Sequence, residues 1–378
     1  MANIPDDAKC QYNFLGKSGL RVSNICLGTN TFGGTDRPGQ LNEAASHENI
    51  KRFVEWGGNF FDTANVYSRG ESEKVLGTWL SSQERDRFVI ATKVRSTMEP
   101  DNPNGAGVSR KHISKSIDDS LKRLQTDYID LYQLHSWDGA VPLEETLLTL
   151  NDLVRCGKVR YLGVSNYNGW QLQKITDLAE KMGLNPFISL QQQYNLLSRF
   201  SELEPFQVCK VNGIGVLPYS PLKGGFLAGK VKKGQVPEEG RLKRMAERDQ
   251  NPAGRGQGQP GRGQMHNQYS ILTSEEKNWQ ILEVLERIAT AKGKSIAQVA
   301  LRWLLQKPVV SSVIIGATKV SQIDDNMVAA AGWELSPVEM SELDKVSAPS
   351  LPYPYDRILR MNSSRVNPWN PAGYKVTS

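Results

Sequence analysis

The stretch IDLYQLH, residues 129–135, is a short apolar run that ends in an imidazole side chain. Seven other short apolar runs share this form, and segments with helical periodicity separate them. The eight runs span residues 23–27, 59–61, 89–91, 129–134, 159–163, 188–190, 215–218 and 312–315. Alternating strands and helices favour a parallel sheet, and eight repeats are enough to close a (β/α)8 TIM barrel.

The residues at or just after the ends of these runs carry most of the chemical variety of the chain. They are Gly28 with Thr29, Asp62, Lys93, His135, Ser165 with Asn166, Gln191, Tyr219 and Gly316. In a (β/α)8 barrel the active site lies on the face where the strands end. The sequence therefore predicts that an acid, a cation, an imidazole, hydroxyls, amides and an aromatic ring converge on one mouth.

The clearest helix signal spans residues 109–124, where apolar residues recur at helical spacing and Ser109 can cap the first turn. A second helix is expected to begin near Pro142 and end before Gly157, and a third to end at Gly183. Two more are expected around residues 281–289 and 299–304. We expect the apolar stripe of each helix to pack on the barrel wall.

Three segments depart from the strand–helix rhythm of what is interpreted as a single domain over 1–378, with its core at about 12–348. Residues 12–23 predict a β-hairpin that turns through Gly16 to Gly19 and plugs the lower end of the barrel. The polar, glycine-rich segment 231–270 is a long loop after the seventh strand, and such loops are lids or disordered. Residues 363–378 are expected to form a loose C-terminal tail.

The composition indicates a soluble globular enzyme. The 378 residues are 39% hydrophobic and 23% charged, and no run approaches the roughly 18 apolar residues of a membrane span. The N-terminus does not have the pattern of a secretory signal. The four cysteines form no CxxC pair and no metal-ligand spacing, so we expect no metal site, reduced thiols and a cytoplasmic protein.

The net charge of +6 raises the question of nucleic acid binding. The run GRGQGQPGRGQ, residues 254–264, has the composition of some RNA-binding segments, but no aromatic residues interleave with it. A basic rim that attracts a phosphorylated cofactor explains the charge as well. No nucleic acid partner is therefore expected.

Asp62, Tyr67, Lys93 and His135 form a set that suits reduction of a carbonyl group. A tyrosine can donate a proton to a developing alkoxide, but its ordinary pKa of about 10 makes it slow at neutral pH. A lysine ammonium lowers that pKa, an aspartate keeps the ammonium charged, and a neutral histidine can orient the carbonyl oxygen. Taken singly, a buried Asp–Lys pair is usually structural, and a lone histidine more often belongs to the core.

From about residue 12 to residue 344 the chain resembles the aldo-keto reductase superfamily. It is most similar to the branch that contains bacterial-type aldo/keto reductases and the β subunits of voltage-gated potassium channels. The combination is far more specific than any one motif, and the chain lacks the GxGxxG of a dinucleotide fold. The matching pieces are GLRVSNICLGT (19–29), FFDTANVYSRGESEKVLG (60–77), ATKV (91–94), DYIDLYQLHSWD (127–138), GKVRYLGVSN (157–166), LQQQYNLLSR (190–199), VLPYSPLKGGFLAGK (216–230) and SSVIIGATKVSQIDDNM (311–327).

The resemblance implies a catalytic tetrad with Tyr67 as general acid/base and Asp62, Lys93 and His135 as its partners. It also implies NADPH (NADP+) as the cofactor, with Lys319 placed to neutralise a 2′-phosphate. The other implied cofactor-binding residues are Gly28, Thr29 and Asp62; Ser165, Asn166 and Gln191 at the nicotinamide carboxamide; Tyr219 stacked on the ring; Ser220, Leu222, Gly224, Gly225 and Lys230 at the pyrophosphate; and Gly316, Thr318, Gln322, Asp325 and Asn326 at the adenosine end.

Phe32, Trp137, Tyr353 and its neighbour Tyr355 are expected to line the substrate pocket, and a small carbonyl compound is the expected partner. Oligomeric state stays open. Two hypotheses remain: a soluble NADPH-dependent reductase of aldehydes or ketones, or a cofactor-binding regulatory subunit with little turnover, as in potassium channel β subunits. The long 231–270 segment and the extended tail differ from the compact channel subunits, so the enzyme is favoured.

Overall fold

The computed structural model describes residues 4–34, 39–250, 268–330, 332–362 and 364. An antiparallel hairpin of β1 (Tyr12–Phe14) and β2 (Arg21–Ser23) precedes an eight-stranded parallel sheet. The sheet consists of β3 (Ile25–Gly28), β4 (Phe60–Asp62), β5 (Val89–Val94), β6 (Ile129–Leu134), β7 (Val159–Ser165), β8 (Phe187–Gln193), β9 (Gly215–Tyr219) and β10 (Val313–Ile315). The eight predicted runs are confirmed as strands, and several strands continue into the polar residues beyond the run.

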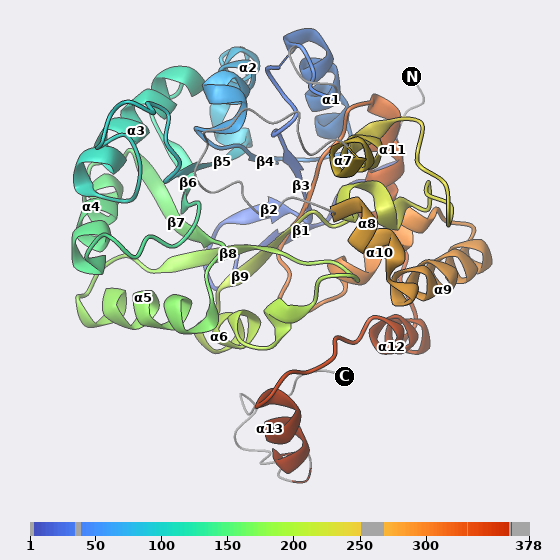
Figure 1. The fold of residues 1–378 in the computed structure, drawn as a ribbon. Coiled ribbons are helices and arrows are strands. Elements are labelled where there is room, and N and C mark those ends of the chain that lie inside the picture. The colour runs from blue at the N-terminus through green and yellow to red at the C-terminus, as the bar shows by residue number, and fades with distance from the viewer. Residues whose placement is uncertain (1–3, 35–38, 251–267, 331, 363, 365–378) are drawn as a thin grey trace.

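Helices surround the sheet, except for the C-terminal one, which lies apart from the barrel (Figure 1). They are α1 (Glu43–Glu55), α2 (Glu71–Leu80), α3 (Arg110–Leu124), α4 (Leu143–Arg155), α5 (Gly169–Lys181), α6 (Pro205–Asn212), α7 (Gly240–Gln250), α8 (Gln268–Ser274), α9 (Glu276–Lys292), α10 (Ile296–Leu305), α11 (Val320–Met327), α12 (Pro337–Val346) and α13 (Tyr355–Asn362). The five expected helices are confirmed as α3, α4, α5, α9 and α10. The Ser109 hydroxyl accepts from the backbone N–H of His112 and caps α3, as its sequence indicates.

The strands follow the order β10-β3-β4-β5-β6-β7-β8-β9, so sequence neighbours lie side by side. The two edge strands meet through backbone bonds near their lower ends. The N–H of Val216 donates to the carbonyl of Val309 at 2.9 Å, and the N–H of Ser311 donates to the carbonyl of Val216 at 3.0 Å. These contacts nearly close the sheet, which confirms the predicted (β/α)8 barrel.

The N-terminal hairpin plugs the lower end of the barrel, as predicted. Leu15 and Val22 are fully buried there. The N–H of Lys17 donates to the carbonyl of Gly213, just before β9, at 2.8 Å. The two side chains pack in one cluster with Cys26, Phe60, Val89, Ala91, Leu131, Ile188, Leu217 and Ile314, which come from the barrel strands.

The alternation of side chains along a strand explains how charged groups reach the upper interior of the barrel. In β5, Val89 and Ala91 belong to the inner cluster, whereas Ile90 and Val94 pack with the residues under the helices. The same alternation places Lys93 on the inner face, above this apolar layer. A polar layer at the carboxyl ends of the strands is therefore a direct result of strand periodicity.

The described parts of the 231–270 segment are partly helical rather than wholly irregular, because they form α7 and the start of α8. Leu242 and Ala246 of α7 are buried, which gives the helix an apolar face to pack. The run 254–264 lies outside the described residues, as does nearly all of the predicted tail at 363–378. A lid role for the segment stays a prediction. Within the described residues, no helix is long and apolar enough to cross a membrane.

Candidate active site

Asp62, Lys93 and Tyr67 form a hydrogen-bonded triad at the carboxyl ends of β4 and β5. Lys93 Nζ donates to Asp62 Oδ1 at 2.6 Å and to the carbonyl of Thr63 at 2.7 Å. The same ammonium lies 3.2 Å from the Tyr67 hydroxyl. The Lys93 side chain is 0% exposed and that of Asp62 is 4% exposed. The ammonium is thus directed by two oxygen acceptors toward the phenol.

The electrostatics of the triad keep Lys93 charged and Tyr67 protonated. Burial alone lowers the pKa of Lys93, but the charge of Asp62 and the contact with Tyr67 outweigh it, so the net pKa is raised. Burial raises the pKa of Tyr67, and the opposing effect of the Lys93 charge does not compensate. Lys93 acts on the pKa of Tyr67 in the expected direction and lowers it, but burial is the larger effect, so the net pKa lies above the ordinary value.

His135 lies beside the triad as a neutral imidazole. Its ring centroid is 5.9 Å from that of Tyr67, and the two rings meet edge to face. Burial lowers the pKa of His135 to about 3, and the charges of Lys93 and Arg95 act in the same direction. Its Nδ1 is buried and has no hydrogen-bond partner among the described residues. The described residues therefore leave this ring nitrogen without a hydrogen bond.

Two amide side chains hold the second oxygen of the Asp62 carboxylate. Gln191 Nε2 on β8 donates to Asp62 Oδ2 at 2.8 Å, and Gln133 Nε2 on β6 donates to it at 3.1 Å. Gln191 was expected only as a cofactor ligand, and Gln133 was not expected in the site. The missed signal is the position of Gln133 in β6, two residues before His135 and therefore on the same face of the strand.

The residues expected at the nicotinamide end lie together next to His135. The Tyr219 hydroxyl donates to Asn166 Oδ1 at 2.8 Å. Asn166 Nδ2 donates to the carbonyl of His135 at 2.9 Å and to Ser165 Oγ at 3.0 Å. Asn166 has a φ of 56°, a left-handed conformation that asparagine tolerates better than most residues. These contacts join the ends of β6, β7 and β9 into one wall of the mouth.

The loop after β9 has the backbone expected of a phosphate-binding segment. Positive φ values occur at Ser220 (52°), Lys223 (46°), Gly224 (69°) and Gly225 (104°). A Cβ at Gly225 would meet no atom within 4 Å, so space lies open above this backbone. The turn begins at Leu222, whose carbonyl accepts from the N–H of Gly225 at 2.9 Å. Lys230, a further candidate in this loop, is exposed.

Lys223 is a cation of this loop that the sequence interpretation did not include. Its Nζ lies 3.1 Å from Ser198 Oγ, and it makes no ion pair within the part of the chain that the structure describes. Burial lowers its pKa. The loop is also anchored by Asn195 Nδ2, which donates to the carbonyl of Ser220 at 2.9 Å. The segment after β8 thus supports the segment after β9.

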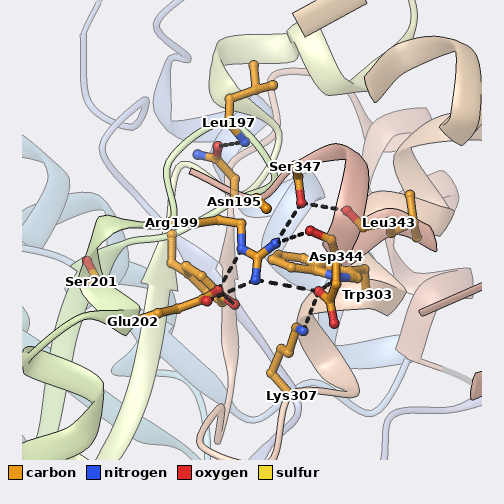
Figure 2. A network of polar contacts seen from close by, with 12 residues as sticks. Asn195, Leu197, Arg199, Ser201, Glu202, Trp303, Lys307, Leu343, Asp344 and Ser347 are labelled. Carbon is orange, nitrogen blue, oxygen red and sulfur yellow. Dashed lines mark hydrogen bonds and ion pairs between the residues drawn. The ribbon is translucent and has the colours of Figure 1, made fainter. Parts of the chain in front are cut away.

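A buried ionic network around Arg199 holds the segment after β8 in place (Figure 2). Arg199 donates to both carboxylate oxygens of Glu202, at 2.8 and 2.9 Å, and to the backbone carbonyl of Asp344 at 2.7 Å. The Asp344 carboxylate accepts from Trp303 Nε1 at 2.9 Å and from Lys307 Nζ at 2.6 Å. The network therefore ties this supporting loop to α10 and α12.

Gly28 and Thr29, at the end of β3, contact the backbone of Asp62. Gly28 pairs with Asp62 in the sheet register. Thr29 Oγ1 lies 3.2 Å from the carbonyl of Asp62 and 2.8 Å from Ser72 Oγ, and Thr29 is fully buried. At the other side of β3, a Cβ on Gly316 would meet nothing closer than 4.0 Å. Gly316 thus leaves open space at the end of β10.

The expected adenosine-end residues are only partly brought together. The N–H of Thr318 donates to Gln322 Oε1 at 2.8 Å at the start of α11. Asp325 instead accepts from Gln298 Nε2 of α10 at 2.7 Å, and Asn326 is buried. The side chain of Asp325 is therefore engaged with a neighbouring helix.

Lys319, expected at a 2′-phosphate, forms an ion pair with Glu239. Its Nζ lies 3.1 and 3.2 Å from the two carboxylate oxygens, and both side chains are largely exposed. Two arginines of α7, which the sequence interpretation missed, lie beside Gly224 (Arg241) and Gly39 (Arg244). A Cβ at Gly224 would lie 3.5 Å from Arg241 Cδ. The pKa of Arg244 is lowered, first by burial and then by the positive charges of Arg241 and Arg248. This end of the mouth is basic.

The aromatic residues predicted to line the substrate pocket lie in different parts of the structure. Trp137 is half-buried and packs against Tyr167 and Trp170, each with its ring centroid 5.4 Å away. Phe32 is fully buried in the core under the helices. Tyr353 is 79% exposed and precedes α13, which lies apart from the barrel in Figure 1. The structure therefore brings Trp137 to the mouth but not Tyr353. Tyr167 and Trp170 were not expected there.

Comparison with known proteins agrees with this barrel and this set of residues. The aldo/keto reductase family model matches residues 24–348, so the chain belongs to the aldo/keto reductase family. It is 36% identical over 360 residues to norsolorinic acid reductase B of Dothistroma septosporum, covering 93% of this chain and 83% of that protein. It is 33% identical over 369 residues to versiconal hemiacetal acetate reductase of Aspergillus parasiticus, covering 92% of this chain and 100% of that protein.

The similarity to a bacterial relative covers a comparable share of both chains. The chain is 33% identical over 353 residues to L-glyceraldehyde 3-phosphate reductase of Escherichia coli, covering 91% of this chain and 94% of that protein. The family and these relatives make the chain an oxidoreductase of the carbonyl-reducing kind, and aldo-keto reductases generally use NAD(P)H. A channel-type regulatory role has no such support among these relatives.

Proposed function

We propose that this chain reduces aldehydes or ketones with NADPH and that Tyr67 donates the proton. The observation that carries the proposal is the buried triad, in which Lys93 Nζ lies 2.6 Å from Asp62 and 3.2 Å from the Tyr67 hydroxyl. A buried charged pair next to a phenol at the mouth of a barrel is the arrangement that proton transfer to a carbonyl oxygen needs. Relatives named for carbonyl reduction support the same reaction class.

Each side chain of the tetrad has a separate task in this mechanism. Tyr67 holds the proton at its hydroxyl, and its raised pKa keeps the proton there until negative charge develops on the carbonyl oxygen. Lys93 then stabilises the phenolate, because its ammonium is charged and already directed at that oxygen. His135, neutral at working pH, donates a hydrogen bond that orients the carbonyl.

The residues of the mouth fit a nicotinamide dinucleotide. The amides of Asn166 and Gln191 suit the carboxamide, and the backbone around Gly225 leaves open space for a phosphate group. When bound, the reduced nicotinamide supplies the hydride. Asn166 and Gln191 are already held by Tyr219 and Asp62, so the chain presents them in fixed orientations.

A preference for NADPH over NADH is supported by Lys319 and by the cations of α7, a helix that begins next to the Lys319 partner Glu239 and lies beside Gly224. Arg241 and Arg244 of α7 repel one another electrostatically, and a phosphate group relieves that repulsion. Lys319 can add its charge only by sharing it with Glu239. We therefore assign the preference to the α7 arginines together with Lys319, rather than to Lys319 alone.

The experiment is NADPH oxidation by the purified full chain against a panel of aldehydes, ketones and quinones. Parallel titrations of NADPH and NADH, followed by tryptophan fluorescence, measure the preference, since Trp137 lies in the mouth. Turnover of at least one carbonyl substrate and tighter NADPH binding are expected. Tight NADPH binding without turnover across the panel points to the regulatory alternative, and equal NADH affinity rejects the roles given to Arg241, Arg244 and Lys319.

A further inference from the structure

Arg95 is a charged residue at the mouth that the tetrad and the cofactor residues do not use. It directly follows β5 and is two residues beyond Lys93. The carbonyl of Val94, the residue before it, accepts from the N–H of His135 at 2.9 Å. The carboxyl ends of parallel strands share one face of the barrel, so Arg95 begins on the same face as the tetrad.

The guanidinium of Arg95 makes no ion pair with any carboxylate of the described residues, and an acid in its surroundings is Asp138, which accepts from the N–H of Val108 at 3.1 Å. Its Nε is buried without a hydrogen-bond acceptor, and within the described ranges Arg95 takes part in no ion pair or side-chain hydrogen bond. The backbone at Arg95 has a φ of 145°, a conformation that side-chain-bearing residues rarely adopt. Its carbonyl accepts from the N–H of Gly107 at 2.8 Å, which helps to hold this conformation.

An unpaired arginine is uncommon in a partly buried site, because a desolvated cation requires an anion or other acceptors. Arg95 differs in this respect from Arg85, Arg123 and Arg199, which all pair with carboxylates. Its charge acts on both His135 and Tyr167, and the Asp138 charge also acts on Tyr167, so Arg95 lies near the tetrad and near the aromatic cluster around Trp137. Arg95 is therefore an unpaired cation beside the tetrad.

We propose that Arg95 forms an anion-binding subsite beside the tetrad and that the preferred carbonyl substrates carry a carboxylate or phosphate group. The proposal rests on the reductase function proposed above and specifies its substrate class. The oxygens of an anionic group would accept hydrogen bonds from the N–H groups of the guanidinium, whose planar arrangement suits bidentate binding of a carboxylate or a phosphate. The neighbouring Trp137 and Tyr167 rings provide apolar surface for the substrate skeleton.

The test compares 2-, 3- and 4-formylbenzoate with their methyl esters in NADPH-dependent reduction, and glyceraldehyde 3-phosphate with glyceraldehyde. The ester group activates the aldehyde more than the carboxylate does, so a preference for the acid reports binding rather than reactivity. For at least one pair, the wild-type chain is expected to favour the anion by about tenfold to a hundredfold in kcat/KM, the size of a charge-assisted hydrogen bond. A preference within the formylbenzoate pairs indicates a carboxylate subsite, and a preference for glyceraldehyde 3-phosphate over glyceraldehyde indicates a phosphate subsite.

Variants of the chain test whether Arg95 causes the preference for anionic substrates. Arg95→Met should reduce the ratio of kcat/KM for anion over neutral partner to about one, and Arg95→Lys should keep part of it. Arg155→Met is the matched control, since it removes the same charge from the exposed last turn of α4, at the opposite end of the barrel. It should leave the ratio as in the wild type. An unchanged ratio in a folded Arg95→Met protein overturns the proposal.

A wild-type measurement keeps the proposal testable if Arg95→Met does not fold. Benzoate and inorganic phosphate should inhibit reduction of the neutral esters more strongly than benzamide does. No preference for any anionic partner, together with equal inhibition by these compounds, rejects the subsite while the reductase function stands. Absence of turnover with every compound, neutral ones included, rejects the reductase function itself.

Discussion

At the scale of single residues, the proposed mechanism depends on the hydroxyl of Tyr67. Tyr67→Phe keeps the ring and its edge contact with His135 but removes the proton and the oxygen that faces Lys93. We expect turnover to fall by about 10² to 10⁴, the usual contribution of a positioned acid, while NADPH affinity changes little. Steady-state kinetics and a fluorescence titration measure the two quantities.

Tyr128→Phe is the control for that substitution. Tyr128 donates its hydroxyl to Asp86 on the outside of the barrel, before β6, and should affect neither quantity. Turnover of Tyr67→Phe within a few-fold of the wild type would falsify the role of Tyr67 as the acid. The low pKa of His135 argues against the imidazole as the replacement, since it carries no extra proton at neutral pH.

The directions of two pKa shifts predict a plain pH profile for reduction. His135 has its pKa lowered to about 3, so its charge does not change between pH 5 and 9. Tyr67 must be protonated to act as an acid, and because its pKa is raised, that form is lost only above the ordinary tyrosine value of about 10. We expect kcat for reduction to be nearly constant from about pH 6 to pH 9.

The profile is measured with saturating NADPH and a neutral aldehyde, which avoids titration of the substrate. A limb with an apparent pKa of about 6 to 7 would mean that an imidazole titrates in the rate-determining complex. Loss of activity between about pH 7 and pH 9 would mean that the pKa of Tyr67 is lowered in the bound state, contrary to its direction in this structure.

At the scale of elements, the loops around β8 and β9 depend on a distant helix. Arg199→Met removes the centre of the buried network and leaves Glu202 without its cation. Breaking a buried pair typically costs about 3 to 5 kcal/mol of unfolding free energy. We therefore expect a loss of that size in urea unfolding, faster hydrogen exchange in α12, and weaker NADPH binding through the segment that anchors Ser220.

Arg287→Met is the matched control, because it removes an arginine that pairs with a carboxylate of the same helix, α12. Arg287 of α9 pairs with Glu342 of α12, but the two side chains are 59% and 39% exposed. An exposed pair contributes about 0 to 1 kcal/mol, so this variant should remain near wild-type stability and keep its NADPH affinity. Equal losses for the two variants would show that Arg199 has no special role in the network.

The same elements show what the sequence can and cannot predict. Apolar runs identify the eight strands because a barrel strand is buried on both faces, and Ser109 identifies the start of α3 because its hydroxyl caps the helix. Gln133 was missed because its strand position predicts the face but not its acceptor Asp62, which is 71 positions away, and Arg95 was missed because only folding decides that it makes no ion pair. Whether Lys319 is paired with Glu239 is likewise decided by folding, which joins residues 80 positions apart.

The pocket aromatics show a second limit. Trp137 and Tyr353 are both aromatic residues near expected loops, yet one packs at the mouth and the other is 79% exposed. The direction of the chain after α12 decides this, and no periodicity in the sequence encodes it. Family motifs therefore predict the tetrad better than they predict the pocket, since the tetrad is positioned by strands and the pocket by loops.

At the scale of the whole molecule, the barrel separates stability from chemistry along its axis. The hairpin and the inner apolar cluster occupy the lower end, and the polar layer of Asp62, Lys93 and Gln133 lies above them. The buried charges are thereby kept from solvent on one side by packed side chains. A substitution at the lower end should consequently change the unfolding free energy without changing the reaction.

Gly16→Ala tests this separation. Gly16 has a φ of +56°, and a Cβ there would lie 2.6 Å from the carbonyl oxygen of Gly213 and 2.7 Å from backbone atoms of Ile188 and Gly215. Backbone cannot move aside cheaply, so we expect a loss of about 1 to 3 kcal/mol in urea unfolding. Gly19→Ala is the control, because a Cβ there meets no atom within 4 Å and should cost little. For folded protein at low temperature, kcat and KM of both variants should match the wild type; a changed kcat in Gly16→Ala would show that the plug is coupled to the mouth.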